Sequence, residues 1–202
     1  MALDSFSNLK AAVQNWMDRS DVAGQAEDFI TLAEGHFNLE LRTREMVTES
    51  TGNTPTSGAI TLPTDFLQTV RVVADTSPPR ELSYIPPQVA SRNYDNTAGL
   101  PSEYTIIGSS LKTYPLSTQD IDLVYYQSIP ALTDSNTSNW LLAKYPNLYL
   151  TACLMEAARY FRDEEEFMVQ AKRANAQITR LNSSEMTAIY AASSRSFSEA
   201  AP

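Results

Sequence analysis

Residues 139–161 read NWLLAKYPNLYLTACLMEAARYF, a mostly apolar stretch that predicts a buried helix. The charged residues 163–166, DEEE, interrupt this pattern before a second helical stretch runs to about residue 190. Negative charge suits a helix start, because carboxylates interact favourably with the positive end of the helix dipole. We therefore predict two C-terminal helices packed on each other, with the rest of the chain arranged around them.

Two further amphipathic helices are predicted near the N-terminus. In the first, Phe6, Leu9, Val13 and Trp16 recur at spacings of three and four, which predicts that they share one buried face. The second helix reaches about residue 45, and its predicted buried face consists of Ala26, Phe29, Ile30, Ala33, Phe37 and Leu41.

In the middle of the chain, the spacing of apolar residues changes from the helical period to the alternation that is typical of strands. Residues 48–58 are rich in Thr, Ser, Gly, Asn and Pro and predict a loop. Residues 66–73 and 120–126 alternate as strands do, and residues 103–115 predict a hairpin that turns at 108–110. The middle of the chain is therefore predicted to form a small antiparallel sheet.

Together these patterns predict an α+β fold that is mainly α. It is a bundle of about four helices, two N-terminal and two C-terminal, with a small central antiparallel β-sheet and an extended C-terminal tail. The predicted bundle comprises residues 1–50 and 139–190, and the inserted β region with long loops comprises residues 51–138. Residues 191–202, mostly Ala and Ser with one Glu, form the predicted tail.

Composition and charge restrict the function classes. The 202 residues carry a net charge of −9, and an acidic chain gains little from counterion release on nucleic acid, so a general DNA or RNA binder is not expected. A single cysteine, Cys153, excludes a disulfide scaffold within one chain. No secretory signal and no membrane-spanning stretch of about 20 apolar residues is expected, which predicts a cytosol-like compartment.

No catalytic, cofactor or metal site is predicted, and the chain is not expected to be an enzyme. The single histidine, His36, has Glu40 one helical turn away, but one such pair builds no site and predicts a partly exposed histidine. A zinc site needs three or four ligands, whereas the chain has one His and one Cys. Cys153 is interpreted as a buried apolar residue, and residues 163–166 as a helix start rather than a cation site.

Aromatic residues gather in the second half of the chain, and two interpretations of them stay open. They can fill the core, or they can form subunit contacts, since Tyr and Trp are enriched at protein interfaces. The set is Tyr125, Tyr126, Trp140, Tyr145, Tyr149, Tyr160 and Phe161.

The order of short motifs along the chain resembles a known family. The motifs are LPTDF at 62–66, YTIIGSSL at 104–111, YP at 114–115, YY at 125–126, IPAL at 129–132, SNTSNWLL at 135–142 and YPNLYL at 145–150. After two N-terminal helices, this ordered set resembles the head-to-tail adaptor proteins of tailed bacteriophages, also called head-completion or connector proteins. The resemblance covers about residues 1–190.

This resemblance implies a structural protein of the virion, located in the neck below the capsid portal and in the host cytoplasm during assembly. Family members form a ring, typically dodecameric, that extends the DNA channel and docks the tail. The implied partners are the portal protein, a downstream tail or nozzle protein, and further copies of the chain. Packaged DNA would pass without sequence-specific binding, and neither a cofactor nor a membrane is implied.

Two segments are predicted to contact partners. The resemblance implies that a C-terminal segment, here residues 183–202, reaches the portal, with Arg195 and Phe197 as candidate anchors. The polar connection at 128–139 contributes the candidate contacts Ile129 and Leu132, and Trp140, directly after it, is a further candidate. Either the β region or the loops at 48–58 and 128–139 are expected to serve neighbouring subunits or the next ring.

Two other function classes remain as alternatives from the residues alone. The first is a carboxylate-dependent hydrolase of cell-wall glycan in a phage tail, which would need two carboxyls facing each other in a cleft. The second is a small helical assembly or regulatory module that binds one partner transiently.

Overall fold

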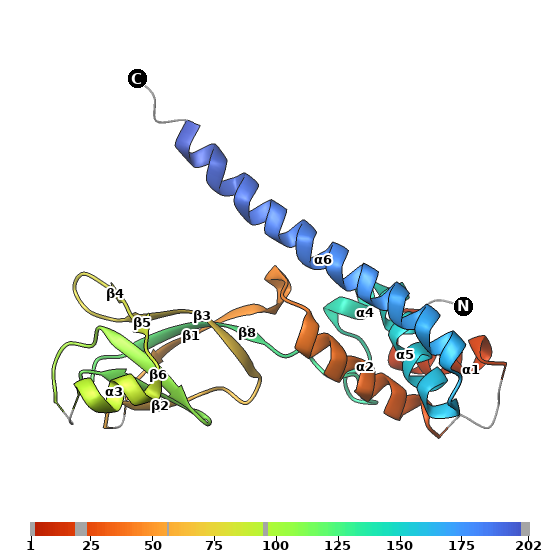
Figure 1. Cartoon of the computed structure of the whole chain (residues 1–202), viewed down its shortest axis with the longest axis horizontal. Helices are drawn as coiled ribbons and strands as arrows, with labels where there is room; N and C mark the ends of the chain where they lie inside the picture. The colour runs from red at the N-terminus through yellow and green to blue at the C-terminus, as the bar shows by residue number, and fades with distance from the viewer. Residues whose placement is uncertain (1–2, 19–23, 56, 95–96, 199–202) are drawn as a thin grey trace. The chain divides into compact units, whose positions relative to one another are not determined.

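The computed structural model describes residues 3–18, 24–55, 57–94 and 97–198 (Figure 1). Side chains are not described for Met186 and for residues 188–198. The chain divides into two compact units, a helical unit of residues 1–45 and 129–202 and a β unit of residues 46–128. Of the helices in the described ranges, none is long and apolar enough to cross a membrane.

The predicted fold class is wrong. The described residues form six α-helices and eight strands in two four-stranded sheets, rather than a four-helix bundle with one small sheet. The predicted extended tail is also wrong, because the last helix continues from Glu164 to Ser198. The helix contains neither Gly nor Pro, the two residues least favourable in a helix interior, and its final turns include Ala188, Ala191 and Ala192.

The helical unit is built around α5 (Pro146–Phe161), which packs against four other helices and buries nearly every residue from Leu148 to Ala158. This confirms the predicted buried helix. The helices around it are α1 (Phe6–Trp16), α2 (Ala26–Glu40), α4 (Trp140–Lys144) and α6 (Glu164–Ser198). A short 3-10 helix, η1 (Arg44–Met46), follows α2.

Local sequence sets where these helices begin and end. The Ser5 hydroxyl accepts the Asn8 N–H at the start of α1, and the Asn139 side chain accepts the Leu142 N–H at the start of α4. α5 ends where Arg162 adopts a left-handed conformation with φ 57°. The Asp163 carboxylate then accepts the Glu166 N–H at 3.0 Å, which confirms that the acidic run starts a helix.

The β unit consists of two sheets. One has the strand order β1 (Val47–Asn53), β8 (Ile121–Gln127), β3 (Phe66–Ala74) and β4 (Arg80–Glu81). The other has the order β2 (Ala59–Thr61), β7 (Ser110–Tyr114), β6 (Glu103–Ile107) and β5 (Ser83–Tyr84). The helix α3 (Pro87–Asn93) contacts β6.

The core of the β unit lies on one face of β8. Ile121, Leu123 and Tyr125 are buried there, whereas the intervening residues of the strand are only partly buried. The Tyr125 hydroxyl donates to Asp65 at 3.0 Å, which satisfies the polar end of this aromatic side chain. The predicted hairpin at 103–115 and the predicted strand at 120–126 are confirmed as β6–β7 and β8.

Candidate assembly surfaces

A buried carboxylate fixes the connection that leads into α4. Glu34 of α2 is buried, and its Oε1 accepts the Leu132 N–H at 2.8 Å and the Tyr149 hydroxyl at 3.0 Å. Burial raises the pKa of the Glu34 carboxyl above its ordinary value, although the two hydrogen bonds act in the opposite direction. One side chain of α2 therefore joins the 129–139 segment to α5.

Asn139 completes this network. Its amide nitrogen donates to the Pro130 carbonyl at 2.8 Å and to the Tyr149 hydroxyl at 2.7 Å, so both of its N–H groups are used. Its amide oxygen accepts the Leu142 N–H at 2.9 Å. Burial raises the pKa of Tyr149, which keeps this hydroxyl protonated and able to donate to Glu34.

Further bonds fix both ends of the same segment within the helical unit. The Asn38 side chain accepts the Ile129 N–H at 2.9 Å, and the Phe6 N–H donates to the Thr137 carbonyl at 2.7 Å. Although it lacks helix and strand, the segment is held at several points and presents exposed residues between them. Those exposed residues are Pro130, Ala131, Thr133, Asp134, Ser135, Thr137 and Ser138.

The structure places the predicted contact residues in different environments. Ile129 and Leu132 lie in the interior of the helical unit, 3% and 5% exposed, whereas Trp140 is partly exposed. The Arg195 and Phe197 side chains lie outside the described residues, although their backbone belongs to α6. That these five residues contact partners stays a prediction.

The residues considered for chemistry are not assembled into a reactive site. Cys153 is fully buried, and burial raises the pKa of its thiol, which disfavours the reactive thiolate. His36 is partly buried, and Glu40 is exposed at the end of α2. Within the part of the chain that the structure describes, no group of three or more His, Cys, Asp or Glu could hold a metal ion.

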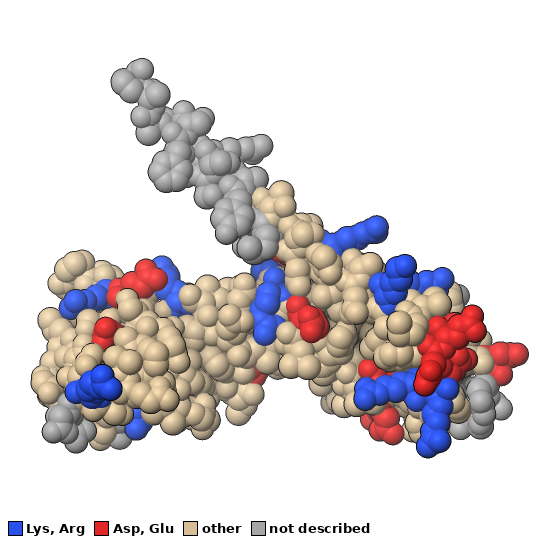
Figure 2. Space-filling view, viewed as in Figure 1, with Lys and Arg blue, Asp and Glu red and all other residues tan. Residues whose placement is uncertain are grey.

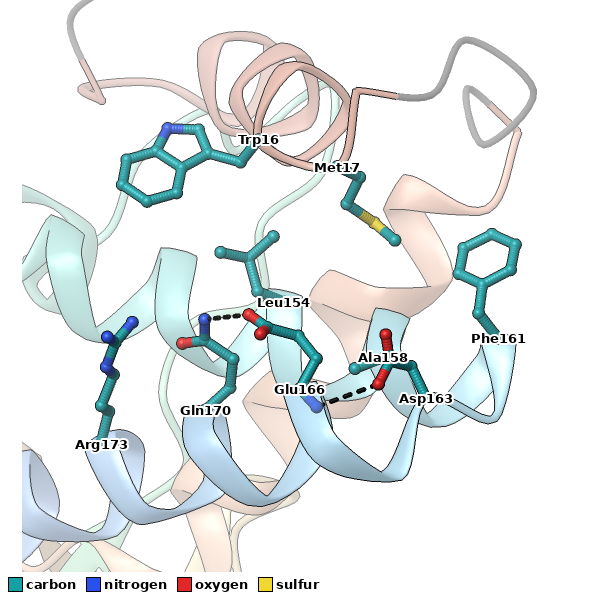
Figure 3. A pocket seen from close by; sticks show the side chains of 9 residues that line it. All are labelled: Trp16, Met17, Leu154, Ala158, Phe161, Asp163, Glu166, Gln170 and Arg173. Carbon is teal, nitrogen blue, oxygen red and sulfur yellow. Dashed lines mark hydrogen bonds between the residues drawn. The ribbon is translucent and has the colours of Figure 1, made fainter.

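An open groove runs along α5 and α6, and sequence reasoning missed it. Two adjoining cavities of about 440 and 460 Å³ share Trp16, Leu154, Gln170 and Arg173 in their walls. Figure 3 shows Trp16 on one side of the first cavity, Gln170 and Arg173 on the other, and Leu154 between them. We name these two cavities together the α5–α6 groove.

The prediction that Trp16 lies on the buried face of α1 is wrong, because 67% of the residue's surface is exposed. The other three residues of that stripe, Phe6, Leu9 and Val13, are buried as predicted. Trp16 is the last residue of α1, so the helix leaves it at the edge of the core, where its ring forms a wall of the groove.

Two exposed leucines of α2 were also missed. Leu32 and Leu39 are 54% and 76% exposed, although both are large apolar side chains. Their spacing of seven residues places them on one side of the helix, and neither belongs to the predicted buried face. A search for apolar pairs outside the core face would have found them.

Charge is distributed unevenly over the helical unit. Figure 2 shows a group of acidic side chains over the start of α6, whose first turn contains Glu164, Glu165 and Glu166. Further along α6, residues 170–180 contain Lys172, Arg173 and Arg180 and no acidic residue. The groove is therefore acidic at one end and basic along the rest of its α6 wall.

Comparison with known proteins gives one family. The family model described as "SU10 adaptor protein" matches residues 4–200, nearly the whole chain. A search of curated proteins found no match to this sequence.

Proposed function

The chain belongs to the SU10 adaptor protein family, a family of phage head-to-tail adaptors, and from that premise we propose that its copies form a ring beneath the portal. Membership makes the chain a structural phage protein of the virion, and it favours a role without catalysis. In the proposed assembly a ring, with twelve copies as the expected number, extends the DNA channel and docks the downstream tail or nozzle protein.

The family match over residues 4–200 is the observation that carries this proposal. The helical unit supports it, because the Glu34–Tyr149–Asn139 network holds an exposed non-helical segment in a fixed position. A surface that must fit the same partner in every copy of a ring benefits from such preorganisation. We propose that the exposed residues of the 129–139 segment contact a neighbour or the next ring.

The C-terminal part of α6 is the proposed portal-binding element. The helix has 35 residues, which corresponds to a length of about 52 Å at 1.5 Å per residue. A helix of this length can extend well past the core that anchors its first half. Arg195 and Phe197, in its last turns, are the proposed anchors on the portal.

The acidic character of the chain suits a channel through which DNA moves. With a net charge of −9, the chain as a whole repels phosphate, so packaged DNA would pass without binding to a specific sequence. Weak, screened repulsion of this kind allows sliding, and it needs no base-specific side chain.

Negative-stain electron microscopy of the purified chain with the portal protein of the same phage tests the proposal. We expect a ring bound to one end of the portal, with rotational symmetry that gives the number of copies. The portal supplies a template, so the test holds even if the free chain stays monomeric. Portals without a bound ring, at protein concentrations above those of the portal, would contradict the proposed function.

A further inference from the structure

One side of α2 is an apolar ridge that faces away from the core of the helical unit. Asp28, Leu32, Gly35 and Leu39 are all exposed and follow one another at spacings of four, three and four residues. This spacing places them on one side of the helix, which we name the α2 ridge. The buried side chains of α2, such as Ala26, Ile30 and Phe37, lie on the opposite side.

The α5–α6 groove has the shape of a helix-binding site. Leu150 and Leu154 of α5 contribute apolar side chains, Trp16 forms one wall, and Arg173 and Arg180 of α6 form the other. Aligned with it along α6, a third cavity of about 350 Å³ reaches Ser184. From Glu166 to Ser184 this face of α6 extends about 27 Å, whereas the 15 residues of α2 extend about 22 Å.

The charges of the two surfaces are complementary. α2 contains neither Lys nor Arg, and two of its carboxylates, Asp28 on the ridge and Glu40 at the C-terminal end, are exposed. Its other two do not contribute, because Glu34 is buried and Glu27 lies 4.0 Å from Lys10. Residues 170–180 of α6 contain three basic side chains and no acidic one. Among the described residues, Asp28 and Glu40 have no ion-pair partner, and neither do Arg173 and Arg180.

We propose that the α2 ridge of one copy lies in the α5–α6 groove of the next copy. Leu32 and Leu39 enter the groove beside Trp16, and the exposed carboxylates of Asp28 and Glu40 face Arg173 and Arg180. This is the helix-in-groove mode of recognition, in which apolar anchors one or two turns apart give affinity and flanking charges set the orientation. The inference rests on the proposed ring, because it assigns the contact that would join its subunits.

No residue belongs to both surfaces, so one copy can present its ridge to one neighbour and its groove to another. Such a contact is heterologous: each copy uses a different surface on each side. Heterologous contacts produce rings when the rotation between copies closes, which is the symmetry that an adaptor ring needs. A two-fold dimer would instead bring the same surface together twice.

Charge reversal of each surface provides the first part of the test. One variant carries Asp28→Lys with Glu40→Lys, and the other carries Arg173→Glu with Arg180→Glu. All four side chains are exposed, and the paired changes at opposite ends of α2 offset each other's effect on the helix dipole. Each variant alone should reduce ring formation on the portal by about tenfold, because like charges then face each other across the contact.

Mixing the two variants is the decisive part. The ridge of the first variant is basic and fits the acidic groove of the second, while the ridge of the second fits the groove of the first. An equimolar mixture should therefore restore ring formation to the wild-type level, with alternating copies, whereas each variant alone stays about tenfold below it. Failure of the mixture to assemble would overturn the inference, provided that circular dichroism finds both variants folded.

A matched pair of apolar substitutions separates this contact from general effects. Leu39→Asp, in the ridge, should abolish ring formation, whereas Met168→Asp should leave it intact. Met168 is as exposed as the leucines, at 67%, and lies on α6 away from the groove walls. If wild-type rings form and the Leu39→Asp variant forms them equally well, the ridge–groove contact is refuted while the proposed ring function stands. If wild-type rings do not form, the proposed function fails and this inference falls with it.

Discussion

At the scale of single residues, Glu34 is a buried carboxylate that holds two other segments of the helical unit through hydrogen bonds. Its carboxylate is buried and accepts from both a backbone N–H and a tyrosine hydroxyl, so its removal leaves two buried donors without an acceptor. An unsatisfied buried donor costs about 1–3 kcal/mol, which is more than the net gain of a typical hydrogen bond.

Substitution of Glu34 should therefore separate loss of the acceptor from loss of the charge. We expect Glu34→Ala to lower the free energy of unfolding by about 2–4 kcal/mol, because the Leu132 N–H and the Tyr149 hydroxyl lose their acceptor. Glu34→Gln retains an amide oxygen and should cost about 1 kcal/mol. Urea denaturation followed by circular dichroism measures both values, and equal stability of the two variants would contradict this account.

The pH dependence of stability should report the raised pKa of Glu34. Burial raises it above its ordinary 4.5, so the folded chain holds this proton more tightly than the unfolded chain. The contribution of this group to stability is therefore greatest below pH 4.5 and decreases as pH rises through the raised value. The difference in free energy of unfolding between wild type and Glu34→Gln, measured from pH 4 to 8, should decrease with rising pH and then level off. A difference that increased over this range would refute the raised pKa.

At the scale of elements, sequence periodicity predicted the helices with a packed face. The stripe Phe6, Leu9 and Val13 became α1, and residues 139–161 became α4 and α5. Periodicity failed for Trp16, because its position satisfies the stripe while the helix ends there, at the edge of the core. A helical pattern predicts which side of the helix faces the core, but it does not predict how far the core extends along the helix axis.

The polar segment at 48–58 is a second place where the sequence-based prediction was wrong. It was predicted as a loop, but residues 47–53 form β1, which pairs with β8 through the backbone. Thr48 and Ser50 lie opposite the buried Tyr125 and Leu123, so small polar residues occupy the face where a strand pattern would place apolar ones. The partner strand supplies the apolar residues, and strand propensity depends strongly on such context.

Gly58, which precedes β2, packs closely against Leu116 and has a backbone conformation that favours glycine. Its φ is +74°, and a Cβ there would lie 2.6 Å from Leu116 Cδ2 and 3.3 Å from Leu116 Cα. Gly58→Ala should thus lower the free energy of unfolding by about 1–3 kcal/mol, since both backbone strain and contact oppose the methyl group. Gly35→Ala is the matched control: no atom lies within 4 Å, and replacing glycine within a helix should raise stability by about 0.5–1 kcal/mol. Thermal denaturation of both variants checks the opposite signs.

At the scale of the whole molecule, residue chemistry alone left several function classes open. The motifs at 129–150, which carried most of the family resemblance, coincide with the network around Asn139 and Tyr149. The proposed assembly surfaces were harder to find from the sequence, because the groove is formed by residues from α1, α5 and α6 that are far apart in the chain. Only packing brings Trp16, Leu154 and Arg173 to one place.

Packing also divides α6 into two parts with different expected roles. Ala174, Ile178 and Leu181 are buried against the helical unit, and Glu185 pairs with Arg44 at 2.6 Å. These contacts anchor the first half of the helix. If residues 188–202 serve the portal, as proposed, their removal should leave the anchored half and its stability unchanged.

Truncation after Thr187 tests this division of roles. The shortened chain should unfold at the same urea concentration as the full chain, because the Arg44–Glu185 ion pair and the buried positions of α6 remain. It should fail to form rings on the portal, since Arg195 and Phe197 are removed. Arg195→Glu with Phe197→Ala in the full-length chain is the finer variant and should weaken portal binding without changing helix content. Portal binding that survived the truncation would exclude residues 188–202 as the anchor and shift the search to the exposed residues of the 129–139 segment.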